Sequence, residues 1–154
     1  MGVSGSGKTT LGQKLAGALG LPFFDGDHYH PPENIRKMSA GTPLGDADRQ
    51  GWLQRLNQLA RSHEDKGAVI ACSALKEQYR QLLGKGLEKG IQWIYLKGDY
   101  GELLERMAGR EGHFMPKDLL KSQMDTLEEP PYGIHIPVAL APHEALETAL
   151  GKLQ

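Results

Sequence analysis

The sequence predicts an α/β fold in which helices flank a parallel sheet, and two observations support this prediction. A phosphate-binding loop opens the chain: residues 2–9 read Gly-Val-Ser-Gly-Ser-Gly-Lys-Thr and match the pattern G-x-x-x-x-G-K-[ST]. After the loop, short apolar runs alternate with segments whose apolar residues recur at helical spacing, as in βα units. With 154 residues, 39% apolar and 24% charged, the chain has the size and composition of a single domain over residues 1–154.

Helices and strands are expected in alternation along the chain. Leu11, Leu15 and Leu19 predict a helix directly after the loop. We expect strands at residues 23–27, 68–72, 91–96 and 134–140. Further helices are expected to begin at the caps Asp46 and Ser73, near Tyr100, before Leu119 and at Pro142. The segment 28–45, rich in Pro, Gly and charge, is expected to lie on the substrate side.

Only Met1 precedes the phosphate-binding loop, although such a loop normally follows a buried strand. We therefore expect that the first strand of the sheet is missing. Strands 23–27 and 68–72 should then pair with each other but be separated from strand 91–96 by a gap one strand wide. The corresponding hypothesis is that the natural protein begins several residues upstream and that Met1 is an internal methionine.

Composition narrows the class of partner. The net charge is −1 and no run of like charges occurs, so there is no electrostatic basis for binding nucleic acid. The longest apolar run has the length of a core strand, too short to cross a membrane. Cys72 is the sole cysteine, so no intrachain disulfide forms, which fits a reducing compartment. We expect a cytoplasmic protein with no nucleic-acid or membrane partner.

The phosphate-binding loop predicts ATP and Mg²⁺ as the cofactors. In such loops backbone N–H groups surround phosphate oxygens, the lysine, here Lys8, reaches the outer phosphates, and the hydroxyl, here Thr9, ligates Mg²⁺. The alternative is a Gly/Ser-rich turn that happens to precede Lys-Thr, but the helix pattern that follows favours a nucleotide site. The expected nucleotide-binding residues in the loop are Gly2, Ser4, Gly5, Ser6, Gly7, Lys8, Thr9 and Thr10.

Asp25 and Asp27 end the first expected strand. In extended backbone both side chains point to one face, at the edge where open α/β sheets bind ligands. One carboxylate would hold Mg²⁺, and the other would accept the proton of a substrate hydroxyl; alternatively, both are turn residues. His28 and His30 nearby do not predict zinc, because no Cys or acidic partner stands at motif spacing.

Two pairs of cationic residues are further candidates. Arg106 and Arg110 share a helix face and border an expected lid, so they could lie over the transferring phosphoryl group, although such arginines are usually solvated or paired. Lys76 and Arg80 also share a helix face, just past a strand end. They would either bind an anionic substrate or coat the helix.

Longer stretches resemble the gluconate kinase family, whose P-loop kinases are related to shikimate and nucleoside monophosphate kinases. The similarity covers nearly the whole chain and includes residues 25–38, 41–49, 71–76, 110–116 and 122–128; the stretches 72–76 and 110–114 together are specific to the family. It implies transfer of the ATP γ-phosphoryl group to the 6-hydroxyl of D-gluconate, giving 6-phospho-D-gluconate. It also implies a P-loop kinase fold with a substrate-binding insertion at about 28–66, a lid at about 110–130, and commonly a homodimer.

The resemblance assigns roles residue by residue. Lys8, Asp27 and Arg110 are the expected catalytic residues, Thr9 and Asp25 the metal ligands, and Arg106 a nucleotide contact. The expected substrate-binding residues are Asp27, His30, Arg49, Lys76 and Arg80. Two other functions stay open: a kinase for another hydroxy acid such as shikimate, and a nucleotide-binding protein without turnover. The residues that contact adenine also stay unassigned, because the last strand lacks the expected acidic residue.

Overall fold

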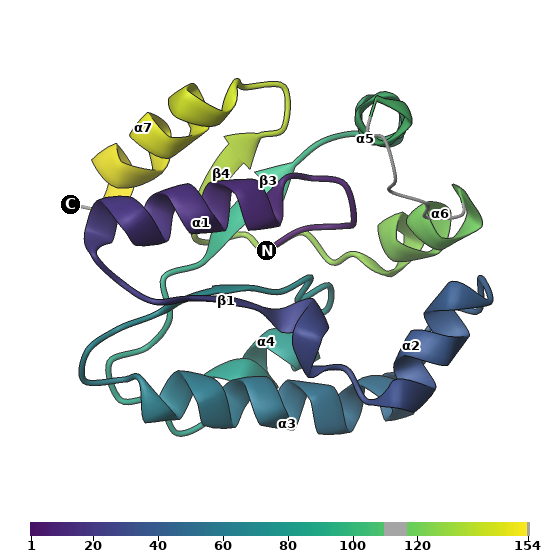
Figure 1. Cartoon of the computed structure of the whole chain (residues 1–154), viewed down its shortest axis with the longest axis horizontal. Coiled ribbons are helices and arrows are strands. Elements are labelled where there is room, and N and C mark those ends of the chain that lie inside the picture. Colours follow the sequence, from purple (N-terminus) through teal and green to yellow (C-terminus); the bar gives the residue numbers. More distant parts are fainter. Residues whose placement is uncertain (110–116, 154) are drawn as a thin grey trace.

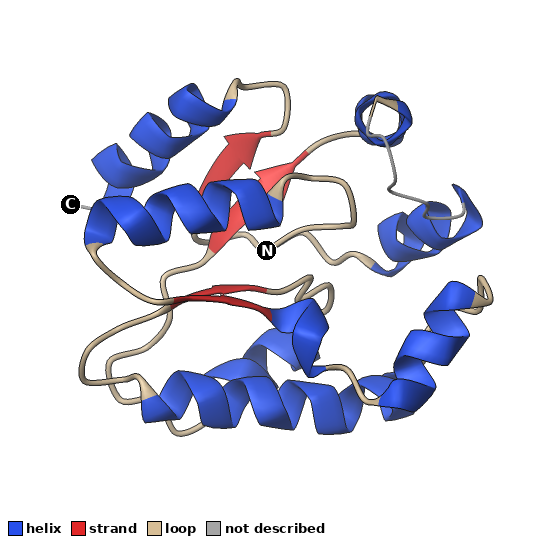
Figure 2. Cartoon of the chain, viewed as in Figure 1, coloured by secondary structure: helices blue, strands red, loops and turns tan. Residues whose placement is uncertain are grey.

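The computed structural model describes residues 1–109 and 117–153 and confirms the α/β class (Figures 1 and 2). The strands are β1 (Phe23–Asp25), β2 (Val69–Ala71), β3 (Ile94–Lys97) and β4 (Ile134–Pro137). The helices are α1 (Lys8–Leu19), α2 (Pro32–Ser39), α3 (Asp46–Ser62), α4 (Glu77–Gly84), α5 (Tyr100–Ala108), α6 (Lys117–Thr126) and α7 (Pro142–Leu153), with a 3₁₀ turn η1 (Gly26–Tyr29) after β1.

The strands form two separate parallel pairs, which confirms the expected gap. β1 pairs with β2, β3 pairs with β4, and within the described residues no strand joins the pairs. The N-terminus lies between them (Figure 1). There Met1 O accepts from Leu96 N at 2.9 Å, beside β3, and Gly2 N donates to Ser73 O at 3.2 Å, just past β2.

Helices cover both faces of the strands. α1 and α7 lie together on one face, and α3 and α4 pack together on the other (Figure 1). The apolar spacing predicted the inward face of α1 correctly at Leu11 and Leu15, which are buried, and Trp52 and Leu56 of α3 are buried as well. Trp52 also anchors the end of β1, since its indole Nε1 donates to Gly26 O at 2.7 Å. The core therefore holds the loops at the strand ends in place.

Strand ends differ from the sequence-based expectation. β1 ends at Asp25, two residues early, because the Asp25 side chain accepts from Asp27 N at 3.0 Å and caps the 3₁₀ turn η1. Asp25 and Asp27 therefore do not share one face of an extended strand, and that prediction was wrong. β3 begins at Ile94 rather than at residue 91. β4 ends at Pro137 rather than at residue 140, consistent with a proline that lacks an N–H.

Two predicted helix caps are also wrong. α4 begins at Glu77 with Lys76 at its N-cap, because residues 73–76 form a loop in which Ala74 has φ 46°. Gly45 rather than Asp46 caps α3, and its N–H donates to Asp48 Oδ2 at 2.9 Å. α2, which was not predicted, begins with a proline in its first turn, where a missing N–H costs nothing. Within the described residues, none of the helices combines the length and apolar character needed to cross a membrane.

Candidate active site

The phosphate-binding loop has the backbone conformation that its glycines allow. Gly5 has φ 78° and Gly7, the N-cap of α1, has φ 96°, both in the left-handed region. A side chain at Gly5 would also meet Met107 Cγ at 2.7 Å. The loop therefore leads directly into the N-terminus of α1, where backbone N–H groups and the helix dipole favour phosphate. Lys8 Nζ donates to Val3 O at 2.9 Å.

Arg106 of α5, the expected nucleotide contact, lies beside this loop. A Cβ added at Gly7 would stand 3.4 Å from Arg106 Nη2, and Arg106 Nη1 donates to Val138 O at 2.6 Å. Its Nε is buried and has no hydrogen-bond partner within the described part of the chain. A buried N–H without a partner costs free energy, so this arginine is not saturated by the contacts that the described residues make. Arg110, the predicted catalytic residue of the lid, lies outside the described residues.

Gln123 is a residue that the site prediction missed. Its side chain reaches from α6 to the phosphate-binding loop, where Gln123 Oε1 accepts from Ser4 N at 2.7 Å. The two residues are far apart in the sequence, so no local pattern indicated this contact. The only available signal was that Gln123 falls within the family-like stretch 122–128.

Thr9 and Asp25 come together as the predicted metal pair. Thr9 Oγ1 donates to Asp25 Oδ2 at 2.9 Å, and Asp25 Oδ1 accepts from Asp27 N. A hydroxyl and a carboxylate at an accessible position suit Mg²⁺, which takes few protein ligands and retains several waters. The residues present therefore fit the ion, and Asp27 follows directly at an exposed position on η1.

A polar cluster from α3 and from α4 with its N-cap residue forms the candidate acceptor site. Arg49 on α3 is only 8% exposed, and its Nη1 donates to the Tyr79 hydroxyl on α4 at 3.1 Å. That hydroxyl donates to Asp46, and Lys76 Nζ also donates to Asp46 Oδ1, at 3.1 Å. The hydrogen bond from Tyr79, followed by that from Lys76, lowers the pKa of Asp46. Sequence analysis treated Asp46 as a helix cap and assigned Tyr79 no role in the site, so it missed their part in this cluster.

Within the described residues, the Arg49 guanidinium has no carboxylate partner within ion-pair distance. Its burial matters, because within the described part of the chain this cation contacts a neutral hydroxyl and the ring of Tyr79, and it has lost solvation without gaining an anion. The cluster therefore offers a cationic donor to an anionic ligand.

His30 lines the same region. Its ring stacks on Trp52 with 4.1 Å between centroids, and its Nδ1 is 3.2 Å from Asn34 Nδ2. Burial lowers the pKa of His30, while the charge of Asp27 raises it and that of Arg49 lowers it. The two charges act on the same ring, so Asp27, His30 and Arg49 lie within electrostatic range of one another.

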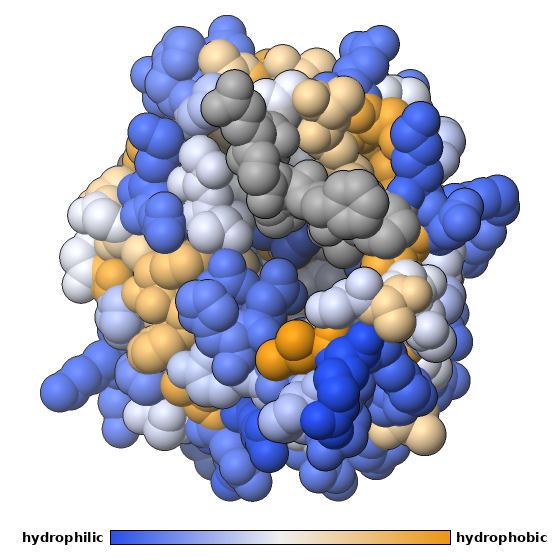
Figure 3. All heavy atoms as spheres, turned by 45° about the vertical axis from the view of Figure 1, so that its right-hand side comes forward, coloured by the Kyte–Doolittle hydropathy of each residue, from blue (hydrophilic) through white to orange (hydrophobic). Residues whose placement is uncertain are grey.

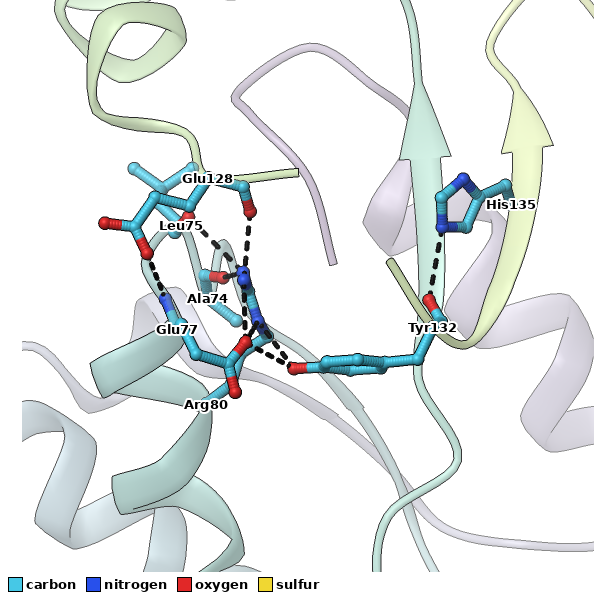
Figure 4. A network of polar contacts seen from close by, with 7 residues as sticks. All are labelled: Ala74, Leu75, Glu77, Arg80, Glu128, Tyr132 and His135. Carbon is cyan, nitrogen blue, oxygen red and sulfur yellow. Dashed lines mark hydrogen bonds and ion pairs between the residues drawn. The ribbon is translucent and has the colours of Figure 1, made fainter. Parts of the chain in front are cut away.

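Arg80 belongs to a different network, and the structure does not bring it to the acceptor cluster (Figure 4). Its guanidinium donates to the carbonyl of Ala74 at 2.8 Å and of Glu128 at 2.9 Å, and to the Tyr132 hydroxyl at 2.9 Å. It also pairs with Glu77 at 3.0 Å, and its side chain is 2% exposed. Arg80 thus ties the loop after β2 to the segment after α6.

The nucleotide and acceptor residues come from elements that converge at one end of the molecule. Figure 3 turns this end, with α2, α5 and α6, toward the viewer and shows a hollow bordered mostly by hydrophilic residues. A phosphate-binding loop, a metal pair and a cationic cluster at the carboxyl ends of parallel strands define a class, the P-loop small-molecule kinases.

Comparison with known proteins agrees with this class and narrows it. The family model described as "Shikimate kinase" matches residues 4–132. A shikimate kinase from Acinetobacter baumannii, 19% identical with a TM-score of 0.51, shares the fold. A gluconokinase structure from Sinorhizobium meliloti 1021 is 45% identical with a TM-score of 0.92, covering 99% of this chain and 88% of that one. The thermosensitive gluconokinase of Escherichia coli (strain K12) is 52% identical over 84% of this chain and 70% of that protein. The chain belongs to the gluconokinase family of P-loop kinases.

Proposed function

We propose that this protein transfers the γ-phosphoryl group of ATP to the 6-hydroxyl of D-gluconate, giving 6-phospho-D-gluconate and ADP. The observation that carries the proposal is the position of an unpaired, buried Arg49 within electrostatic range of the Asp27 region, next to the Thr9–Asp25 pair. A substrate with a carboxylate at one end and a hydroxyl at the other matches this arrangement. Relatives named gluconokinase at 46–52% identity support the same substrate.

On the nucleotide side, the loop N–H groups and Lys8 would bind the phosphates. Arg106, whose Nη2 lies beside Gly7, would add a cationic donor to the phosphates. Thr9 and Asp25 would hold Mg²⁺, which would neutralise charge on the phosphate oxygens when bound. Arg110 would add a further cation over the transferring group from the lid at about 110–130.

On the acceptor side, Asp27 would accept the proton of the 6-hydroxyl. The hydroxyl oxygen of gluconate would bond to the γ-phosphorus while the bond from that phosphorus to the β–γ bridging oxygen breaks. Arg49 would bind the gluconate carboxylate through its planar fork. Lys76 and His30 would complete the pocket, and Tyr79 would hold Arg49 in position through its hydroxyl.

The proposal also covers the domain, the oligomeric state and the compartment of the protein. A single kinase domain over residues 1–154 would carry a substrate-binding insertion at about 28–66, and we infer a homodimer in the cytoplasm from the family resemblance. A buried, unpaired Cys72 is consistent with a reducing compartment. Sedimentation equilibrium would test the dimer, because a species with the mass of one chain at all concentrations would contradict it.

The deciding experiment is a product assay with ATP, Mg²⁺ and a panel of hydroxy acids. We expect 6-phospho-D-gluconate from D-gluconate and no product from shikimate. Transfer to shikimate without transfer to gluconate would contradict the substrate assignment. ATP binding with no transfer to any acceptor in the panel would favour the second candidate, a nucleotide-binding protein without turnover, which the split sheet motivates.

A further inference from the structure

Asn34 is a buried polar residue outside the proposed catalytic and binding residues. It lies on α2, is only 2% exposed, and makes two contacts through its side-chain nitrogen Nδ2. Nδ2 donates to the backbone carbonyl of Asp48, in the first turn of α3, at 2.8 Å, and it lies 3.2 Å from Nδ1 of His30. α2 lies beside the N-terminal end of α3 at this point (Figure 1). The amide of Asn34 therefore joins both helices to the ring of His30.

These two contacts determine which nitrogen of the His30 ring carries a hydrogen. The carbonyl oxygen of Asp48 only accepts, so the NH₂ group of Asn34, rather than its oxygen, faces that carbonyl. The second hydrogen of the same NH₂ group is left for His30 Nδ1, which accepts it through an unprotonated lone pair. A ring with an unprotonated Nδ1 is neutral and carries its hydrogen on Nε2. Asn34 thus selects one tautomer of His30.

The ring of His30 is also fixed in orientation. It stacks on Trp52 with 4.1 Å between centroids and 17° between the ring planes, while Nδ1 is held by Asn34. The other ring nitrogen, Nε2, has no hydrogen-bond partner among the described residues. It is not enclosed, since the buried side-chain polar atoms without a partner in that part of the chain are Ser6 Oγ and Arg106 Nε. One N–H donor of fixed direction is therefore available to a ligand.

The charges around His30 favour the neutral ring. Burial, the largest effect, lowers the pKa of His30, while Asp27 raises it and Arg49 lowers it. A charged ring would repel the Arg49 guanidinium, and its hydrogen on Nδ1 would face the NH₂ group of Asn34. A guanidinium matches a carboxylate, whereas a neutral N–H matches a hydroxyl oxygen, which carries no charge. Arg49 and His30 therefore offer donors of two kinds to one ligand.

We propose that Asn34 is a positioning residue that holds His30 as the neutral Nε2–H tautomer, and that this N–H donates to a hydroxyl oxygen of the acceptor. The inference rests on the proposed function for the identity of the acceptor, D-gluconate, but not for the tautomer. It makes the pair a determinant of specificity, because an acceptor without a hydroxyl at that position leaves the Nε2 hydrogen unpaired. His30 is a donor and not a general base, since Nε2 already carries its hydrogen.

The first test determines the tautomer in the protein without substrate. Long-range ¹H–¹⁵N correlation spectra of the histidine rings, recorded at about pH 8.5, above the ordinary pKa of 6.5, distinguish protonated from unprotonated ring nitrogens. The signals lost in His30→Gln assign the His30 ring. We expect an unprotonated Nδ1 and a protonated Nε2, and the reverse in Asn34→Asp, whose carboxylate accepts from Nδ1. A hydrogen on Nδ1 of the unsubstituted protein, or an equal mixture of tautomers, would overturn the proposal.

The second test measures the affinity for D-gluconate by titration calorimetry at the same pH. Asn34→Asp should weaken binding by about three- to tenfold, because Nε2 loses its hydrogen. The matched control is Asn57→Asp, because Asn57 Nδ2 also donates to two acceptors, the carbonyls of Leu83 at 2.8 Å and Lys85 at 2.9 Å, and neither belongs to a histidine. Asn57→Asp should therefore keep its affinity for D-gluconate.

His30→Gln and His30→Leu give the same answer if Asn34→Asp does not fold. The side-chain amide of Gln can still donate near the position of Nε2, whereas Leu cannot. We expect His30→Gln to stay within about threefold of the original affinity and His30→Leu to lose about tenfold. Equal affinities within either pair of variants would overturn the proposal and leave gluconate phosphorylation intact. The expected tautomer without any binding of D-gluconate would instead contradict the proposed function, and with it the role of Nε2 as a donor to gluconate.

Discussion

The proposed nucleotide side and the proposed acceptor side of the candidate site are built in different ways. The nucleotide side comes mainly from one contiguous stretch, the loop and the first turn of α1, with Asp25 and Arg106 brought to it. The acceptor side is assembled from η1, α3 and the loop that leads into α4, through Asp27, Arg49 and Lys76. A contiguous motif binds a ligand that many proteins share, whereas an assembled cluster selects a particular acceptor.

This difference predicts that substitutions on the two sides change different kinetic constants. The largest effect is expected for Lys8→Ala, which removes a charge from the phosphates. We expect turnover to fall by about a thousandfold, with little change in melting temperature. Lys14→Ala, an exposed position on the same helix, is the control and should be neutral. Retained turnover in Lys8→Ala would show that the loop does not act on a transferring group.

Asp27→Asn tests the point where the two sides meet. An amide cannot accept the hydroxyl proton, so we expect turnover to fall by about a hundredfold or more while the affinity for ATP stays near its original value. Asp65→Asn, at a fully solvated position, serves as the control. Both constants follow from initial rates and from a nucleotide-binding titration. An unchanged turnover would remove Asp27 from the catalytic residues.

Arg49→Lys tests whether the Arg49 guanidinium binds the acceptor. Lysine keeps the charge but loses the bidentate fork, so we expect the KM for gluconate to rise about tenfold or more, with a smaller change in kcat and none in the KM for ATP. A loss confined to kcat would instead indicate that Arg49 acts in the transition state. Tyr79→Phe, which removes the hydroxyl that Arg49 contacts, should shift the same constant in the same direction by less.

Arg80→Met tests whether this arginine is structural. The substitution leaves the carbonyls of Ala74 and Glu128 without their donor, so we expect a loss of roughly 3 kcal/mol in the free energy of unfolding. Arg36→Met is the control, because its ion pair with Glu33 is exposed and contributes little. Urea unfolding measures both. A stable Arg80→Met protein with a raised KM for gluconate would place Arg80 in acceptor binding after all.

The smallest expected effect is the contribution of His30 to the pH dependence of folding stability. Its pKa in the folded protein is lowered by burial, so the folded state disfavours the charged ring. Stability should therefore be highest above the ordinary pKa of 6.5 and should fall as the pH drops below it, because the unfolded state binds the proton more readily. His30→Gln should flatten this dependence in urea midpoints measured between pH 7 and 5. An identical dependence in both proteins would contradict the assignment.

Much of the fold could be predicted from local patterns, and the candidate site only in part. The loop and the helix after it followed from spacing and residue type, whereas the pairing of Thr9 with Asp25 was expected from the family resemblance. The end of β1 could not be predicted this way, because a side-chain cap by Asp25 competes with the strand and converts the following residues to a 3₁₀ turn. α2 was missed because its Pro and charged residues resemble a loop, although Asn34 is buried and donates to Asp48 O.

The sequence by itself determined the class of chemistry, because glycines with positive φ, a lysine and a hydroxyl at fixed spacing form a phosphate site wherever a helix follows. Only the tertiary structure decided which buried arginine is left for a ligand and which one supports the fold. Arg49 and Arg80 are both buried, yet one faces a neutral hydroxyl and the other is saturated by carbonyls and a carboxylate. Burial and partners are set by elements distant in the chain, and these determine whether a buried cation binds a ligand or supports the fold.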